Sequence, residues 1–185
     1  MSADFPKRAR HAPPLSDALR GRLLTLRPAE ARDLPFLRDL YAGFRAAELA
    51  LVPWPEAQKC AFVDDQFRLQ HVHFTRWYAT ADFWVVMQAH PLSLPRPIGR
   101  LYLDRAPRAW RIVDIGLVAA ARGQGLGSAM IGWIQASAAA AGASLALEVA
   151  ANNPRAHALY RRLGFRDAGQ RSATHQPMAW RAPVS

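Results

Sequence analysis

Cysteine and long apolar runs are almost absent from this sequence. Cys60 is the only cysteine among 185 residues, which excludes an intramolecular disulfide and a metal cluster built on cysteines. No apolar run approaches the roughly 20 residues that a membrane-spanning helix needs, and the first residues lack the apolar core of a secretory signal. We therefore expect a cytoplasmic protein with no membrane contact and no metal.

Acidic residues are also scarce. Lysine and arginine number 24 against 14 aspartates and glutamates, so the net charge is +10. Such a surface attracts anions, which include nucleic acid and polyphosphate cofactors. The sequence has no motif for reading nucleic acid, and we do not expect nucleic acid as a partner. The net charge alone does not choose among the other anions, which are membrane phosphates, acidic proteins and a polyphosphate cofactor.

The length and composition fit one folded domain. Hydrophobic residues make up 51% and charged residues 21%, which is typical of a globular chain and excludes general disorder. Lys7, Arg8 and Arg10 cluster near prolines at the start of the chain. We predict a flexible tail over residues 1–20 and a single domain over 21–185.

Hydrophobic periodicity predicts a mixed α/β domain. Strand patterns occupy residues 23–27, 82–88, 98–104, 110–118, 144–149, 165–170 and 175–180. Helical patterns occupy residues 33–43, 55–80, 128–142 and 153–164. The proline-rich stretch 89–97 predicts an irregular hairpin tip between two strands.

The stretch "RGQGLG", Arg122 to Gly127, stands between the strand 110–118 and the helix that follows. The first N–H groups of a helix lack partners and lie at the positive end of its dipole. Glycines let a ligand approach this backbone, so the N–H groups of Gly123 to Ser128 are candidate donors to a phosphate. The Lys-Ser/Thr ending of a P-loop and the G-x-G-x-x-G spacing of dinucleotide sites are both missing.

Two separate motifs resemble the acetyl-CoA site of the GNAT N-acetyltransferase superfamily. Arg122, Gly125 and Gly127 fill its Arg/Gln-x-x-Gly-x-Gly/Ala pattern after "DIGLVAAA", and "LALEVAANNPRAHALYRRLGF" matches its second block. The likeness covers about residues 23–182, and its specific motifs lie between Asp114 and Phe165. Ala119 to Ala121 depart mildly from the family, which often has proline and acidic residues there.

The resemblance implies an α+β fold with a mixed, mostly antiparallel sheet flanked by helices. Two parallel strands, 110–118 and 144–149, would splay apart to hold the pantetheine arm of acetyl-CoA, the co-substrate. Homodimers are common in this superfamily, so a homodimer is expected. The implied cofactor-binding residues are Leu117, Val118, Arg122, Gly123, Gln124, Gly125, Leu126, Gly127, Ser128, Asn153 and Tyr160.

The same resemblance implies catalytic roles. Tyr160 matches the tyrosine that protonates the departing thiolate, and backbone N–H groups near Leu117 and Val118 match the oxyanion donors. Glu148 matches the glutamate proposed as base in ribosomal-protein acetyltransferases, and we slightly favour it. Asp114, on the preceding strand, is the rival, and a water chain is a third route for the proton.

We therefore expect an acetyl-CoA-dependent N-acetyltransferase that acts on a primary amine by direct attack in a ternary complex. A catalytically idle acyl-CoA sensor or scaffold of the same fold, and an enzyme with another acyl-CoA donor, stay open as alternatives. The acceptor is not specified. Residues 33–79, the proline-rich hairpin and the last strands, which would select it, carry no motif.

Overall fold

The computed structural model describes residues 4–6, 12–90 and 92–183. Seven strands form one sheet in the order β1-β2-β3-β4-β5-β7-β6. Every neighbouring pair is antiparallel except β4 and β5, which are parallel. This confirms the expected α/β fold with a mixed, mostly antiparallel sheet. The strands are β1 Leu24–Pro28, β2 Asp82–His90, β3 Ser93–Ala106, β4 Ala109–Leu117, β5 Ser144–Ala150, β6 Arg166–Asp167 and β7 His175–Trp180.

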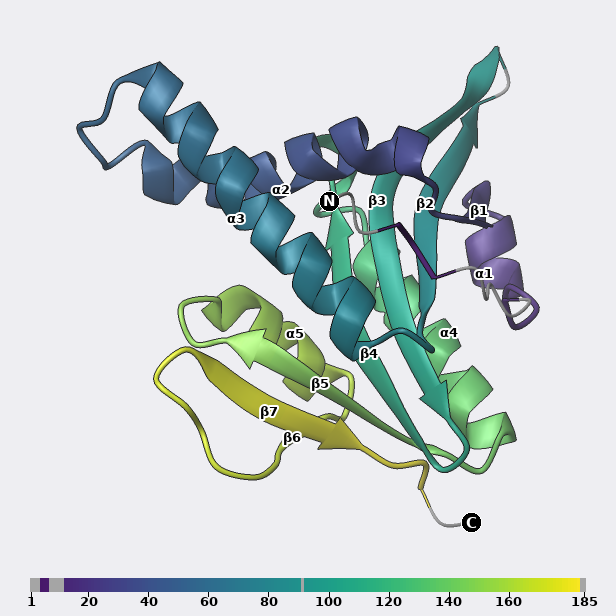
Figure 1. Ribbon diagram of the computed structural model, residues 1–185. Coiled ribbons are helices and arrows are strands. Elements are labelled where there is room, and N and C mark those ends of the chain that lie inside the picture. Colours follow the sequence, from purple (N-terminus) through teal and green to yellow (C-terminus); the bar gives the residue numbers. More distant parts are fainter. Residues whose placement is uncertain (1–3, 7–11, 91, 184–185) are drawn as a thin grey trace.

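Helices cover both faces of the sheet (Figure 1). On one face lie α2 (Leu34–Leu49), which follows the 3-10 turn η1 (Ala31–Asp33), and α3 (Glu56–Trp77). On the other face lie α4 (Leu126–Ala140), which follows the 3-10 turn η2 (Ala119–Ala121), and α5 (Pro154–Arg162). We call these the α2/α3 face and the α4/α5 face.

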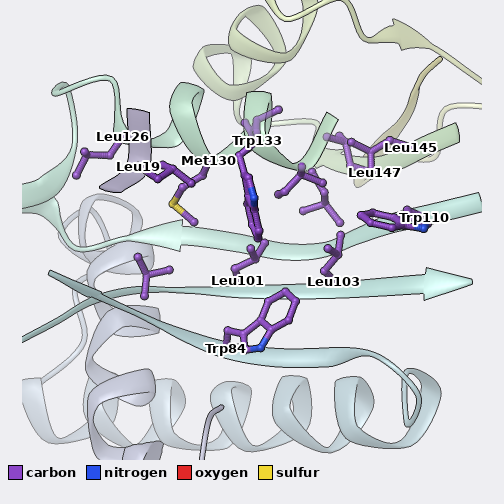
Figure 2. Close-up of a cluster of buried hydrophobic side chains, with 14 of the residues drawn as sticks. Leu19, Trp84, Leu101, Leu103, Trp110, Leu126, Met130, Trp133, Leu145 and Leu147 are labelled. Atoms are coloured by element: carbon purple, nitrogen blue, oxygen red, sulfur yellow. The ribbon is translucent and has the colours of Figure 1, made fainter. Parts of the chain in front are cut away.

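The main core lies between the sheet and α4 (Figure 2). Alternate residues of the strands, such as Leu101, Leu103, Leu145 and Leu147, point toward this helix and are buried. The helix presents Met130, Trp133, Ile134 and Ala138, which are buried at the spacing that its sequence predicts. This packing fixes the position of α4 and therefore of its N-terminus.

The segment before β1 also packs on this core. The short helix α1 (Asp17–Arg20) buries Leu19, which is 2% exposed, and the indole Nε1 of Trp133 donates a 2.9 Å hydrogen bond to the carbonyl of Pro14. Residues 12–20, which the sequence assigns to a flexible tail, therefore contact the core through apolar side chains despite their proline-rich composition. Residues 1–3 and 7–11 lie outside the described residues.

Two further elements exceed their expected bounds. Helix α2 continues past Gly43 to Leu49, whose side chain is buried together with Tyr41 in a cluster shared with α3. Tertiary packing thus overrides the low helix propensity of glycine. Strand β3 runs through the proline-rich stretch, and Pro97 pairs with Met87. The prolines precede Gly99, where pairing with β4 ends, so one side of β3 is an edge that tolerates a missing N–H.

A buried ion pair joins β1 to the start of α2. Arg27 donates from Nη1 and Nη2 to the two carboxylate oxygens of Asp33, at 2.7 and 2.5 Å, and the Glu30 N–H donates to the same carboxylate at 2.8 Å. Burial by itself would raise the pKa of Asp33. The hydrogen bonds and the charge of Arg27 outweigh that effect, so the pKa is lowered from its usual value.

We expect Asp33→Asn to reduce the free energy of unfolding at pH 7 by about 2 kcal/mol, because hydrogen bonds to charged groups contribute on that scale. A lowered pKa in the folded state stabilises the protein above the unfolded pKa of about 3.9, and this contribution is lost as the pH falls below it. Urea unfolding at pH 7 and at about pH 3 measures both values. The difference between the two proteins should shrink at the acidic pH, and a constant difference would contradict this account.

Candidate active site

Strands β4 and β5 part in the middle of the sheet. They pair only from Ala109–Ser144 to Ile112–Leu147. On the other side of β4, Leu103 pairs with Ile112 and Tyr102 pairs with Asp114, so Val113 has no partner and forms a β-bulge. A bulge bends its strand and increases the local twist. The bulge therefore lies where β4 leaves β5, and a gap opens beyond it.

The bulge also changes which side chains face each side. Ile112 belongs to the core under α4, whereas Asp114 contacts Arg100 on the α2/α3 face. Gly116 lies on that same face, because a Cβ built on it would clash with Cζ of Phe44 on α2. Phe44 is 37% exposed. Glycine at position 116 thus lets this ring rest on the β4 backbone beside the gap.

Backbone groups at the end of β4 differ in their availability. The N–H of Val118 donates to the carbonyl of Ile98 at 2.8 Å. The N–H of Val118, one of the two predicted oxyanion donors, is thus engaged within the sheet. Successive N–H groups along a strand point to opposite sides, so the N–H of Leu117 is directed toward the gap. This direction of the Leu117 N–H is the one that an oxyanion donor requires.

The glycine loop ends the gap at the N-terminus of α4. Gly123 and Gly125 have φ values of 76° and 72°, a conformation that favours glycine, and Gly125 directly precedes the helix. In the described part of the chain, no N–H from Gly123 to Ser128 donates to a backbone carbonyl, and the first such bond is from Ala129 to Gly125. Cβ atoms built on Gly123 and Gly127 meet nothing within 4 Å. The loop therefore offers open N–H donors to an anion.

Two arginines flank this loop in different directions. Arg122 donates from Nε to the carbonyl of Leu117 at 2.9 Å, and its guanidinium carbon lies 5.1 Å from the ring centre of Phe44. It thus faces the α2/α3 side and not the open N–H groups. Arg22 donates to the carbonyl of Gln124 at 2.7 Å and lies 3.7 Å from the Cβ position of Gly125. The sequence has no signal for Arg22, which is 102 residues away along the chain.

The remaining predicted cofactor-binding residues lie in the glycine loop, in the first turn of α4 and at the start of α5. Leu126 is buried in the core, and the side-chain amide of Gln124 donates to the carbonyl of Ala120 at 2.8 Å. Asn153 caps α5, since its Oδ1 accepts the N–H of Ala156 at 3.1 Å. Ser128, in the first turn of α4, is partly exposed. These residues shape the loop and the neighbouring helix start.

Tyr160 lies on α5 and packs, partly buried, against the main core. Its ring packs edge-on against Phe165, with 5.8 Å between ring centres. Burial raises the pKa of Tyr160 to about 12, and the negative charge of Asp114 acts in the same direction. Tyr160 belongs to the α4/α5 face and Asp114 to the α2/α3 face, so the two groups lie on opposite faces of the sheet.

The two candidate bases differ in their surroundings. Asp114 is 20% exposed and pairs with Arg100, which is 2% exposed and donates to Gln70 Oε1 at 2.8 Å. Oδ2 of Asp114 is the oxygen that pairs with Arg100, and Nε of Arg100 is buried without a hydrogen bond among the described residues. Glu148 also points to the α2/α3 face, but it is 50% exposed and lies 3.3 Å from Arg111. The carboxylate of Asp114 is therefore the more enclosed of the two.

The part of the chain that the structure describes has neither a candidate membrane-spanning helix nor a candidate metal site. None of its helices combines the length and apolar character needed to cross a bilayer. No three side chains from histidine, cysteine, aspartate and glutamate gather there as a metal site would require.

Comparison with family models decides the family. The model described as "Acetyltransferase (GNAT) family" matches residues 47–165, which is more than half of the chain. This chain belongs to the GNAT acetyltransferase family. In this GNAT protein the matched segment contains β4, the glycine loop, α4, β5 and Tyr160. No curated protein gives a significant sequence match.

Solved structures share the fold of this GNAT protein. The PaiA N-acetyltransferase of Thermoplasma acidophilum, in complex with coenzyme A, is 12% identical with a TM-score of 0.59, and the match covers 84% of this chain and 97% of that one. An acetyltransferase of Thermus thermophilus is 20% identical with a TM-score of 0.58, covering 85% and 96%. Spermidine N-acetyltransferase of Vibrio cholerae, in complex with CoA and spermine, is 22% identical with a TM-score of 0.55, covering 85% and 95%.

Proposed function

We propose that this GNAT protein transfers the acetyl group of acetyl-CoA to a primary amine, by direct attack in a ternary complex. The observation that carries the proposal is the gap between β4 and β5, which ends at the glycine loop. The open N–H groups of Gly123 to Ser128 would hold the pyrophosphate. The unpaired edges of β4 and β5 would hydrogen-bond the pantetheine arm.

The proposed reaction uses both faces of the sheet. Attack on a thioester needs a donor at the carbonyl oxygen, a base for the amine and an acid for the leaving thiolate. In our proposal the N–H of Leu117 donates to the oxygen. Tyr160 donates its proton to the thiolate from the α4/α5 face, and the amine approaches from the α2/α3 face, where both carboxylates lie.

We propose Asp114 as the base, acting directly or through a water molecule. It is more enclosed than Glu148, and its negative charge contributes to the raised pKa of Tyr160. Arg100 compensates the charge of the Asp114 carboxylate, and Gln70 orients Arg100 from α3. The carboxylate is thereby held in one place beside the gap.

Calorimetric titration with acetyl-CoA tests donor binding, and two glycines of α4 provide a matched pair of variants. Cβ atoms on Gly127 and Gly132 both meet nothing within 4 Å, but only Gly127 borders the open N–H groups. Gly127→Val should weaken binding by about 10-fold or more, because charge-assisted hydrogen bonds to the phosphates are lost. Gly132→Val should bind like the unchanged protein.

Release of the CoA thiol with a panel of primary amines tests transfer. Amine-dependent release supports the proposed enzyme. Saturable binding without release for any amine would instead favour an acyl-CoA sensor, and faster release from a longer acyl-CoA would reassign the donor. Absence of binding at high ligand concentration would overturn the proposed function.

A further inference from the structure

We call the α2/α3 face of the gap the acceptor side, because the amine approaches from it in the proposed reaction. The charged side chains on this side indicate the class of acceptor. Two carboxylates face this side, and an arginine pairs with each of them: Arg100 with Asp114, and Arg111 with Glu148. Arg122 is a third cation on the same side, next to Phe44. Of these five side chains, each carboxylate is thus paired with an arginine, and Arg122 alone has no ion-pair partner among the described residues.

Arg122 is prepared to bind an anion. Its Nε is committed to the carbonyl of Leu117 at 2.9 Å, and the ring of Phe44 lies 5.1 Å from the guanidinium carbon. Within the described residues Arg122 forms no ion pair, and its two terminal amino groups have no hydrogen-bond acceptor. A guanidinium fixed in this way presents a preorganised pair of donors that matches a carboxylate.

The position of Arg122 relates this anion site to the proposed reaction. Its anchor is the carbonyl of Leu117, and the N–H of the same residue is the proposed oxyanion donor. An anion on Arg122 would thus lie near the end of β4 that carries the proposed oxyanion donor. Phe44 and Gly116 form the surface between them. An amine only a few bonds from a carboxylate could contact Arg122 and the acetyl group together.

We infer that the acceptor is an amino acid or a close analogue, whose carboxylate binds Arg122 while its amine attacks the acetyl group. This inference rests on the proposed function. It excludes polyamines as preferred acceptors, because a polycation would meet Arg100, Arg111 and Arg122 without a free carboxylate to bind. It also assigns the Arg122 side chain to acceptor binding, whereas the family motif implies cofactor binding.

Matched pairs of amines test the carboxylate directly. We would compare L-leucine with isopentylamine, L-phenylalanine with phenethylamine, and L-lysine with cadaverine, and use spermidine as the polycation. The amino acid of at least one pair should have a kcat/KM about 10-fold or more above that of its decarboxylated partner. Arg122→Gln should reduce this ratio by about 10- to 100-fold, the range for a charge-assisted hydrogen bond.

Arg122→Gln keeps a side-chain N–H that can donate to Leu117, and its thermal unfolding shows whether the fold is retained. Arg108→Gln is the matched control, since Arg108 is exposed and lies in the turn between β3 and β4. The control should keep the ratio of the unchanged protein. Calorimetry with CoA separates the two possible roles of Arg122. A loss of CoA affinity with an unchanged ratio would assign Arg122 to the phosphates and overturn the inference.

The remaining outcomes separate this inference from the proposed function. Preference for spermidine or for the decarboxylated amines would overturn the inference and support acetyl transfer. Binding of acetyl-CoA with no acetylation of any amino acid would overturn the inference and leave the donor site intact. Absence of acetyl-CoA binding would overturn both.

Discussion

Tyr160→Phe should lower kcat by about 100-fold or more, the usual scale for loss of a general acid, with little change in acetyl-CoA affinity. In the proposed reaction the hydroxyl is a proton donor, while the ring that packs against Phe165 is retained in the variant. Steady-state thiol release gives kcat, and calorimetry gives the affinity. A parallel loss of both would mean that the hydroxyl serves binding and not proton transfer.

The pH dependence of kcat provides a second test of Tyr160 as the general acid. A pKa of about 12 keeps its hydroxyl protonated at every ordinary working pH, and the acid is lost only as the pH rises through that value. Deprotonation of Tyr160 should therefore produce no fall in kcat below about pH 11. Tyr78→Phe, at the end of α3, is the control and should keep the unchanged rate. A wild-type kcat in Tyr160→Phe would remove the acid role.

Asp114→Asn should lower kcat/KM by about 100-fold, whereas Glu148→Gln should change it by less than about 10-fold. The difference follows from their surroundings, since Asp114 lies beside the gap with Arg100 and Glu148 is half-exposed. Removal of the Asp114 charge should also lower the pKa of Tyr160 toward its ordinary value of about 10. Tyrosinate absorbance during an alkaline titration measures this shift.

Stability must be measured together with these rates, because Asp114→Asn leaves the buried Arg100 without its counter-charge. Loss of one partner of a buried pair costs about 3–5 kcal/mol. Rates should therefore be compared at a temperature where both proteins are fully folded. A larger loss in Glu148→Gln than in Asp114→Asn would assign the base to Glu148, as the sequence slightly favours.

The motif around the glycine loop predicted the local architecture because its pattern has direct physical meaning. Alternating glycines at a strand-to-helix junction require an open backbone, and Gly125 does adopt the left-handed conformation before α4. The order of strands followed from hydrophobic periodicity in the same way. The bulge at Val113 had no such signal, since an unpaired residue depends on its partner strand β3.

Side-chain direction was the part that the sequence did not specify. Arg122 belongs to the motif, yet its guanidinium extends toward Phe44 on α2, a helix far earlier in the chain. Arg22 approaches the loop from the segment before β1, with no motif of its own. Both placements depend on contacts between distant segments, which local patterns do not encode. Local patterns likewise did not predict the end of α2, because packing against α3 determines it.

The support of α4 comes from outside the segment that the family shares. The family model begins at residue 47, whereas Pro14 and Leu19 contact the core residues of the helix whose N-terminus borders the gap. A graft of residues 47–165 into another GNAT protein would carry the loop and leave Trp133 Nε1 without its acceptor. Removal of residues 1–20 would likewise act on donor binding through the packing of this helix.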